Sequence, residues 1–263
     1  MRADANFRIF SETLLAGVLE ERHELAIMTY RESHRGTLLG MTRFRDGLDD
    51  MPILGYGKGS LNHDRLEPFH STLSGHSLNY LTRGTYWGTE QRQQKQDAAS
   101  ITEQRYRNDC GTGGEDCSLC MVSSVASSYW VRWMFLSENA DQDIVYVARG
   151  APGRWYAQPE AFGISDAPTR FGTVSYSVQP KQPKGGGLSG WVELQARDGA
   201  PKPVIAVRLS SGVAGSPFAC VHVGGSGATL IAWHAANETV VIQLGVAGHA
   251  NFSAPCSPTP ALR

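Results

Sequence analysis

Hydrophobic residues recur at helical spacing in three stretches of the first 140 residues. The stretches cover residues 11–30, 68–81 and 117–136, and Pro68 suits the first turn of the second one. Their apolar stripes consist of Leu14, Val18 and Leu25; of Phe69, Leu73, Ser77 and Tyr80; and of Val122, Val125, Tyr129, Trp133 and Leu136. The last helix carries small residues between its large ones, which predicts close packing against other helices.

From about Asp143 the pattern changes to short segments rich in β-branched and aromatic residues, separated by turn residues. Several of these segments alternate apolar and polar residues, as half-buried strands do. They are DIVYVARG, GTVSYSVQ, WVELQAR, VIAVRLS, ACVHVG, LIAWHA and TVVIQLG. About seven such strands predict an antiparallel β-sandwich. We therefore expect an α+β protein with a helical segment over residues 1–140 and a β-sandwich over residues 141–263.

Long segments rich in glycine and charge separate the predicted helices. Residues 43–67 form the longest of them, and we expect an ordered loop there because Phe44, Ile53 and Tyr56 are apolar. Residues 91–100 contain no apolar side chain larger than alanine and should be solvated. Three helices with such loops bury little apolar surface, so we expect the chain to be the C-terminal portion of a longer protein.

Composition and charge narrow the class of protein. The chain of 263 residues is 41% hydrophobic and 19% charged, which is typical of a folded domain. A formal net charge of −1 provides no basic field for nucleic acid. No apolar run approaches the roughly 20 residues that span a bilayer, and the N-terminus lacks a signal-peptide pattern. As written, the sequence predicts no nucleic-acid or membrane partner and a cytoplasmic location.

The cysteines do not suggest a disulfide framework. There are five of them, Cys110, Cys117, Cys120, Cys220 and Cys256, and three are clustered. An odd number is atypical of a secreted disulfide-rich protein, and the cluster lacks a nearby fourth soft ligand for zinc. We therefore expect buried thiols and no metal ion.

The stretch RGTYWGTEQR combines aromatic and charged residues at close spacing. It contains Arg83, Tyr86, Trp87 and Glu90. Aromatic rings stack on sugar faces, charged side chains bind hydroxyls, and glycosidases need two carboxyl groups beside the scissile bond. The stretch therefore suits a sugar site with Glu90 at its centre. The alternative is a helix that ends at Gly84, with Trp87 in the core and Glu90 paired to Arg92.

Two further segments concentrate polar residues. NHDRLEPFHSTLSGHS contains His63, Asp64, Arg65, Glu67, His70 and His76. His63, Arg65 and His70 could line a polar pocket, or the segment could form a network of salt bridges. His70 and His76 are six residues apart, which points them to different faces of a helix and argues against a metal site.

The second segment, DCGTGGEDCSLC, places Glu115 and Asp116 just before the last predicted helix. These two acids could cap that helix, or they could face the same cavity as Glu90. The glycines do not match a phosphate loop, and the chain has no G-x-S-x-G elbow of a serine hydrolase. We expect no cofactor.

The order of these segments resembles the C-terminal end of six-hairpin glycosidase-like proteins. The resemblance is carried by HDRLEPFHSTLSGHSLNYLTRGTYWGTEQR, then GGEDCSLCMVSSVASSYWVRWMFL, then VYVARGAPGRWYAQPEAFGISDAPTRFGTVSYSV. Those proteins are (α/α)6 toroids followed by a β-sandwich, and the order is similar to that of inverting α-L-rhamnosidases. The resemblance covers nearly the whole chain.

The resemblance implies a function in carbohydrate metabolism on an oligo- or polysaccharide. It makes Glu90 the general base, places Tyr86 and Trp87 in the sugar subsite and makes residues 125–136 the last toroid helix. The partner carboxylate in this superfamily lies on an earlier hairpin. Within this chain, Glu115 or Glu67 would have to take that role.

Three other functions remain open from the sequence. The first is a non-catalytic carbohydrate-binding or interaction module, which would need exposed aromatic residues on one face of a sheet, for instance Trp191 and Trp233, and which fails if both are buried. The second is a truncated remnant without activity. The third is a polysaccharide lyase on a toroid scaffold, which would use a tyrosine and a histidine, such as Tyr86 and His76, in place of paired acids.

Overall fold

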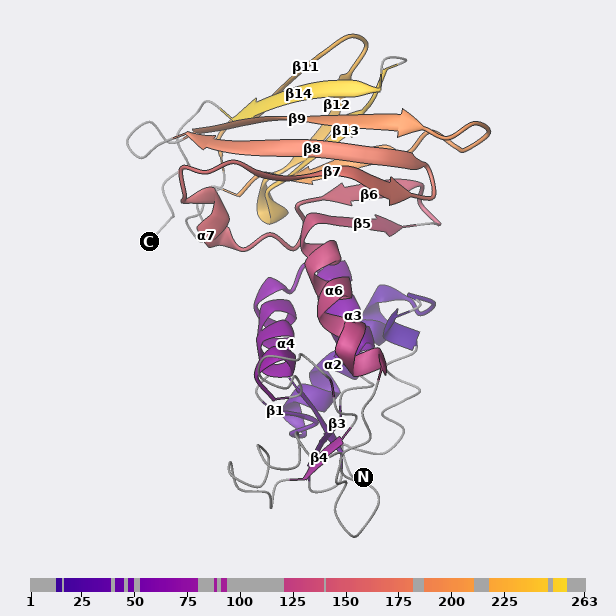
Figure 1. Ribbon diagram of the computed structural model, residues 1–263, viewed down its shortest axis with the longest axis vertical. Coiled ribbons are helices and arrows are strands. Elements are labelled where there is room, and N and C mark those ends of the chain that lie inside the picture. Colours follow the sequence, from indigo (N-terminus) through magenta and orange to yellow (C-terminus); the bar gives the residue numbers. More distant parts are fainter. Residues whose placement is uncertain are drawn as a thin grey trace. The chain divides into compact units, whose positions relative to one another are not determined.

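The protein has a mixed α+β fold that divides into two compact units (Figure 1). The computed structural model describes residues 13–15, 17–38, 41–44, 47–49, 53–79, 88, 91–93, 121–139, 141–181, 187–210, 218–245 and 248–254. The units are Met1–Val131 and Arg132–Arg263, so their boundary lies within helix α6, Met121–Phe135. The sequence predicts the change from helices to strands a few residues later, between residues 140 and 141.

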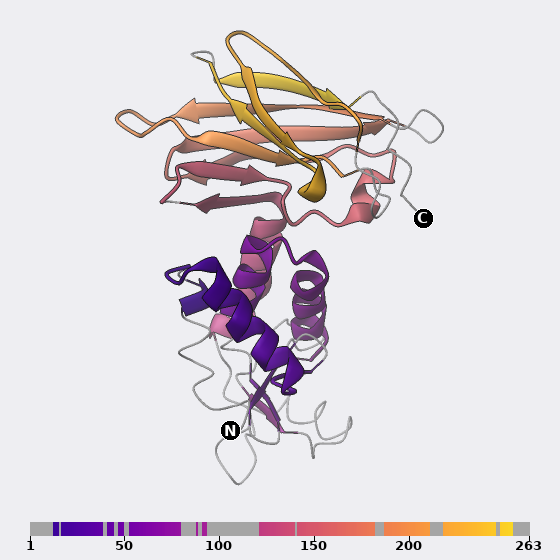
Figure 2. The ribbon, with the colours of Figure 1, turned by 180° about the vertical axis from the view of Figure 1, so that it is seen from behind.

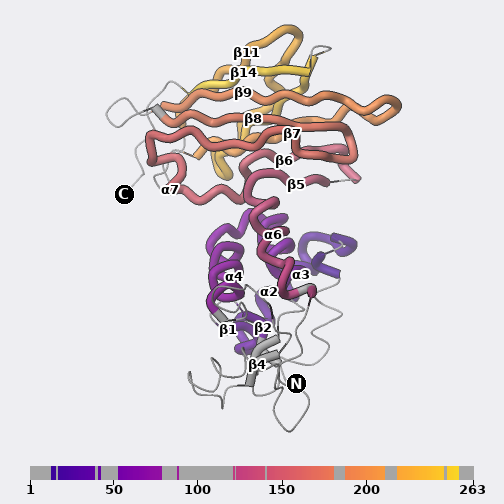
Figure 3. Tube along the Cα trace, viewed as in Figure 1, coloured from indigo at the N-terminus to yellow at the C-terminus, as the bar shows by residue number. Residues whose placement is uncertain are grey.

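Unit Met1–Val131 contains helices and one small sheet. The helices are α2 Glu21–Ser33, α3 Ile53–Asn62, α4 Leu66–Asn79 and the first part of α6. The strands are β1 Thr37–Leu38, β2 Met41–Phe44, β3 Gly47–Asp49 and β4 Gln91–Gln93, in the order β1-β2-β3-β4 with antiparallel pairing. The tube in Figure 3 follows the chain through these elements.

The first predicted helix is interrupted. A helical turn at residues 13–15 ends at Gly17, whose φ of +65° is left-handed, and α2 begins only at Glu21. The N–H of Gly17 donates to the carbonyl of Thr13, as expected where a glycine ends a helix. Leu14 is buried but Val18 is exposed, so the predicted stripe through both residues is wrong.

Helix α3 lies within the segment that we expected to be a loop. Its sequence ILGYGKGSLN contains three glycines, each of which disfavours a helix by roughly 0.8–1 kcal/mol relative to alanine. Close packing explains why they are tolerated. A Cβ at Gly57 would collide with the indole of Trp130 in α6, and one at Gly59 would press on Leu14 and Met28.

The buried face of α6 also differs from the predicted one. Trp130 and the small residues Ser123 and Ala126 are buried, whereas Val125 and Tyr129 of the predicted stripe are exposed. The small residues bring the neighbouring backbone close, and the single large indole fills the remaining space.

Unit Arg132–Arg263 consists of two five-stranded sheets. One has the order β12-β13-β10-β6-β5 and the other β11-β14-β9-β8-β7. The strands are β5 Leu136–Asn139, β6 Ile144–Val147, β7 Phe162–Thr169, β8 Gly172–Lys181, β9 Gly187–Ala196, β10 Val204–Arg208, β11 His222–Gly224, β12 Thr229–His234, β13 Thr239–Gln243 and β14 His249–Ala254. Helix α7 Gly153–Tyr156 and the 3-10 helix η1 Ala235–Asn237 are short connections.

The two sheets enclose one hydrophobic core, in the manner of a sandwich (Figures 1 and 2). Both sheets contribute alternate residues to it, such as Val145 and Ile205 from one and Val174 and Val192 from the other. The pairing of β6 with β10 is parallel, so the expectation of a purely antiparallel sandwich is wrong at this pair. All the other described strand pairs of this unit are antiparallel.

Candidate functional site

The stretch from Arg83 to Arg92 is fixed to the fold at Gly88. The N–H of Gly88 donates to Oγ of Ser124 in α6 at 2.9 Å, and the residue is buried. A Cβ at this position would lie 2.5 Å from Cβ of Ser123, so no larger residue fits. Glycine is therefore required here for close approach to the helix.

A second fixed point follows directly after Glu90. Gln91 begins β4 and pairs with Asp49 of β3, and Arg92 pairs with Leu48. Along the chain, Glu90 thus stands between the backbone contact of Gly88 with α6 and the first residue of β4. The predicted residues Arg83, Tyr86, Trp87 and Glu90 themselves lie outside the described residues, and their assignment to a sugar site stays a prediction.

Beside the Gly88 contact, α6 buries a histidine. His76 of α4 is fully buried, its Nε2 lies 3.1 Å from Oγ of Ser123, and its ring centroid lies 5.3 Å from that of Trp130. Burial lowers the pKa of His76 from 6.5 to about 4. The ring is therefore neutral near pH 7, and its burial keeps it away from any bound substrate.

A second polar cluster joins α2 to the turn between α3 and α4. Glu24 is only 3% exposed, and its Oε2 lies 2.6 Å from Nε2 of His63. The other oxygen of Glu24, Oε1, is buried and has no hydrogen-bond partner in the described part of the chain. A buried carboxylate of this kind depends on its histidine partner for compensation.

A left-handed residue in the turn after α3 aims two side chains at α2. Asp64 has a φ of +57°, and the N–H of Arg65 returns to the carbonyl of Ser60 at 2.8 Å. Such a C-terminal motif reverses the chain direction within a few residues. His63 and Arg65, on either side of Asp64, consequently both contact α2.

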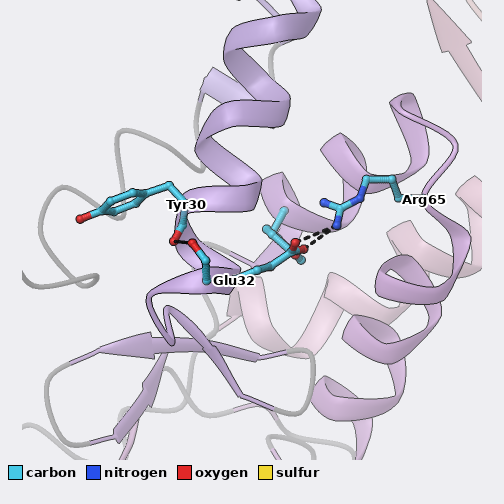
Figure 4. Close-up of polar contacts among 5 residues, drawn as sticks. Tyr30, Glu32 and Arg65 are labelled. Atoms are coloured by element: carbon cyan, nitrogen blue, oxygen red, sulfur yellow. Dashed lines mark hydrogen bonds and ion pairs between the residues drawn. The ribbon is translucent and has the colours of Figure 1, made fainter.

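Arg65 binds the carboxylate of Glu32 through both of its oxygens. Nη2 of Arg65 lies 2.8 Å from Oε1 and 2.8 Å from Oε2, and the side chain of Tyr30 points away from this pair (Figure 4). The hydroxyl of Tyr56 in α3 also donates to Oε1 of Glu32.

Arg65 and Tyr56 remain hydrogen-bond donors to the carboxylate of Glu32. The hydrogen bond to Glu32 raises the pKa of Arg65, and burial together with Glu32 raises the pKa of Tyr56. Tyr56 therefore stays protonated and Arg65 charged at any physiological pH. Glu32 is occupied by two donors, which makes it a poor general base.

These contacts show what three of the predicted site residues do in the fold. Arg65 forms an ion pair with Glu32 and His63 contacts the carboxyl of Glu24, in line with the polar network that the sequence allowed as an alternative. His70 lies edge-on to Phe69 with ring centroids 5.3 Å apart. Whether the three also line a sugar site stays a prediction. Glu115 and Asp116 lie outside the described residues.

The carboxylates of α2 were missed by the sequence analysis. Glu24, Met28 and Arg31 follow one another at helical spacing on the buried face of α2. Charged residues within an apolar stripe were the available signal, because such charges are buried only with partners. The partners of Glu24 and Glu32 lie 24 to 39 residues away in the sequence, so spacing could not identify them.

The described residues offer no group of three or more metal-ligating side chains. Cys220 forms a disulfide, so the expectation of free thiols is wrong at this residue. The other four cysteines lie outside the described residues. Of the helices that the structure describes, none has the length and apolar character needed to cross a membrane.

The two tryptophans of the sandwich differ in position. Trp233 of β12 packs against the hydrophobic core. Trp191 of β9 is partly exposed, and its neighbours Gly190 and Val192 point to the core side. Trp191 therefore stands on the outer face of its sheet, and the two rings do not share one exposed face.

Comparison with known proteins gives likenesses to solved structures alone. No family model matches the chain, and no curated protein matches it. Among solved structures, a GH127 β-L-arabinofuranosidase from Geobacillus stearothermophilus T6 matches with a TM-score of 0.36 and 7% identity. The match covers 94% of this chain and 40% of that one, so this chain spans less than half the length of that enzyme.

Proposed function

We propose that this chain is part of a carbohydrate-active protein, a glycoside hydrolase of the inverting six-hairpin type, with Glu90 as general base. The observation that carries the proposal is the contact of Gly88 with Ser124 of α6, together with the start of β4 at Gln91. A base must be held within a fraction of an ångström of its working position. Glu90 follows one fixed point by two residues and directly precedes the other.

In this mechanism Glu90 takes a proton from a water molecule, which attacks the anomeric carbon of the sugar. A second carboxylic acid protonates the oxygen of the leaving group, and the two carboxyls stand roughly 6.5–9.5 Å apart to admit the water. Glu115 is the partner we propose within this chain. Tyr86 and Trp87 stack on the sugar, and Arg83 and Asp116 bind its hydroxyls, with His63, Arg65 and His70 at the edge of the site.

An exposed apolar face on α6 supports the proposal that further helices complete a toroid. Met121, Val125 and Tyr129 are spaced four residues apart and are 80%, 41% and 50% exposed. Large apolar residues at this spacing form one stripe of a helix, and such a stripe is normally buried against another helix. We propose that helices from a longer chain cover it.

The lyase alternative is less well supported with His76 as its histidine. His76 is fully buried and contacts Ser123 and Trp130. A lyase site would therefore need another histidine of the chain.

The test is hydrolysis by the purified chain of a panel of nitrophenyl glycosides, with the variant Glu90→Gln. Loss of the base should lower kcat by roughly 10²–10⁴-fold. Glu160→Gln is the matched control, because Glu160 is an exposed carboxylate in the unit Arg132–Arg263. In Glu90→Ala, sodium azide should restore cleavage, because azide attacks without a base, and the product should be a glycosyl azide.

One result would contradict the proposal: Glu90→Gln with the activity of the unmodified chain would exclude Glu90 as the base. If the unmodified chain hydrolyses no glycoside in the panel, the same variants have to be compared in a longer chain that includes the additional helices proposed above.

A further inference from the structure

The outer face of the sheet β11-β14-β9-β8-β7 carries one large aromatic residue near its centre. Leu188, Val192 and Leu194 of β9 are buried, so the alternate residues, including Trp191, face outward. β9 is the middle strand of the five. Trp191 is partly exposed and does not contribute to the hydrophobic core.

The strand register surrounds Trp191 with small residues. Trp191 lies opposite Ser177 of β8 and opposite Asn251 of β14. Ser177 lies opposite Gly163 of β7, and Asn251 lies opposite Gly224 of β11. These five residues form one row across the sheet, about 19 Å long at the usual strand spacing. The indole is the only large side chain in the row.

Hydrogen-bonding side chains lie next to the indole in the neighbouring row. His249 stacks beside Trp191 with ring centroids 6.1 Å apart and planes inclined by 21°. His249 lies opposite Glu193, which in turn lies opposite Ser175. The ring is thus bordered by hydroxyl, amide, imidazole and carboxylate groups, which can both donate and accept hydrogen bonds.

The charge of this face decides between classes of ligand. Residues 173–179, 189–195 and 249–253, which form the centre of β8, β9 and β14, contain no lysine or arginine. Polyanions such as nucleic acids and uronic-acid polymers need cationic partners. Lysine and arginine are thus absent from these three strand segments, where Glu193 supplies the one carboxylate, and this suits a neutral ligand.

From this geometry we infer that the outer face around Trp191 binds a neutral polysaccharide. The C–H-rich face of one sugar ring stacks on the indole, while its hydroxyls bind Ser177, Asn251 and His249. The open space at Gly224, where an added Cβ would meet no atom within 4 Å, lets the glycan continue toward β11. The inference concerns binding by the sandwich and is independent of the proposed hydrolysis.

Affinity gel electrophoresis of the whole chain tests the inference. The gels contain arabinan, xylan, glucomannan or mixed-linkage β-glucan as neutral polysaccharides, and polygalacturonate as an acidic one. At least one neutral polysaccharide should retard the chain, and Trp191→Ala should weaken that retardation about tenfold or more, as expected for loss of a central aromatic contact. Ile231→Ala is the control, because Ile231 is 54% exposed on β12 of the other sheet.

A second variant guards against loss of folding in Trp191→Ala. Ser177→Arg adds a long side chain beside the indole without altering the core, and it should cover the ring and remove the retardation. Unchanged retardation in both variants would overturn the inference. Retardation of the unmodified chain by polygalacturonate alone, or by none of the polymers, would do the same. The readout is binding, so it does not depend on turnover by Glu90.

Discussion

Different kinds of contact stabilise the sandwich unit, Arg132–Arg263, and the helical unit, Met1–Val131. In the sandwich, branched aliphatic residues such as Val174 and Val192 alternate with outward polar residues and meet in one core. In the helical unit, Trp130 sits against Gly57, and Glu24 and Glu32 are buried or half-buried against His63 and Arg65. Aliphatic contacts tolerate small shifts, whereas an indole packed on a glycine and a buried contact between a carboxyl and an imidazole depend on exact partners. We therefore expect the helical unit to respond more strongly to single substitutions and to pH.

The strongest effect should come from Trp130→Ala. It would leave a cavity beside Gly57 and His76 and should lower the free energy of unfolding of the helical unit by about 3–5 kcal/mol. Hydrogen exchange followed by mass spectrometry measures the two units separately: amides of α3 and α6 should exchange faster, and those of β8 and β9 should not. Equal acceleration in both units would contradict the proposed difference between them.

Acid should destabilise the helical unit through His76. The pKa of His76 is about 4 in the folded protein and 6.5 in the unfolded chain. The free energy of unfolding is therefore at its full value above pH 6.5 and decreases as the pH falls toward 4, because the unfolded chain then binds a proton that the folded one does not. The loss amounts to about 3 kcal/mol at most. Urea denaturation at a series of pH values checks this. His76→Gln should flatten the profile between pH 6.5 and 4, and an unchanged slope would exclude His76 as the cause.

A smaller effect is expected for Arg65→Lys. Lysine retains the charge but presents a single ammonium group in place of the planar guanidinium that binds both oxygens of Glu32. We expect a loss of about 1–2 kcal/mol, as is usual for hydrogen bonds to charged groups. Urea denaturation measures it, and Arg22→Lys is the control, because Arg22 forms an exposed ion pair with Glu20. If Arg22→Lys lowered the free energy of unfolding as much as Arg65→Lys does, the contact of Arg65 with Glu32 would not be the cause of the loss.

The smallest effect, of opposite sign, is expected in the sandwich unit for Gly153→Ala. An added Cβ at Gly153 of α7 meets no atom within 4 Å, and the residue does not have a positive φ. Alanine there should stabilise the unit by about 0.4–1 kcal/mol, because it restricts the unfolded chain. Differential scanning calorimetry should show the sandwich transition at a higher temperature. A lower transition temperature would show that the site is more constrained than the space around it indicates.

The sequence predicted the sandwich better than the helical unit for a physical reason. In GTVSYSVQ and WVELQAR, apolar and polar residues alternate because one face of the strand is buried and the other is not. These segments form β8 and β9. Helix α3 was missed because its glycines oppose a helix locally and are stabilised only by Trp130 and Met28, which lie elsewhere in the chain. The wrong face was predicted for α6 because size was taken as the sign of burial, and Ser123 and Ala126 are small.

The candidate site shows the same division. Crowding of His63 and Arg65 in one segment predicted a polar cluster, and the structure contains one. The acidic residues of this cluster, Glu24 and Glu32, come from α2. They lie 39 and 33 residues before His63 and Arg65, so no local sequence pattern connects them. The requirement for glycine at position 88 could not be predicted either, because it depends on the position of Ser123 and Ser124.

The parallel pairing of β6 with β10 has a consequence for synthesis of the chain. Val145 and Val147 of β6 are fully buried, yet β10, which covers one edge of β6, begins only at Val204, about sixty residues later. At typical ribosomal rates that interval lasts roughly 3–12 s. During this time β5 and β6 present an unpaired strand edge and exposed valines, a combination that favours aggregation. Chaperone demand during translation should therefore concentrate between the emergence of β6 and that of β10.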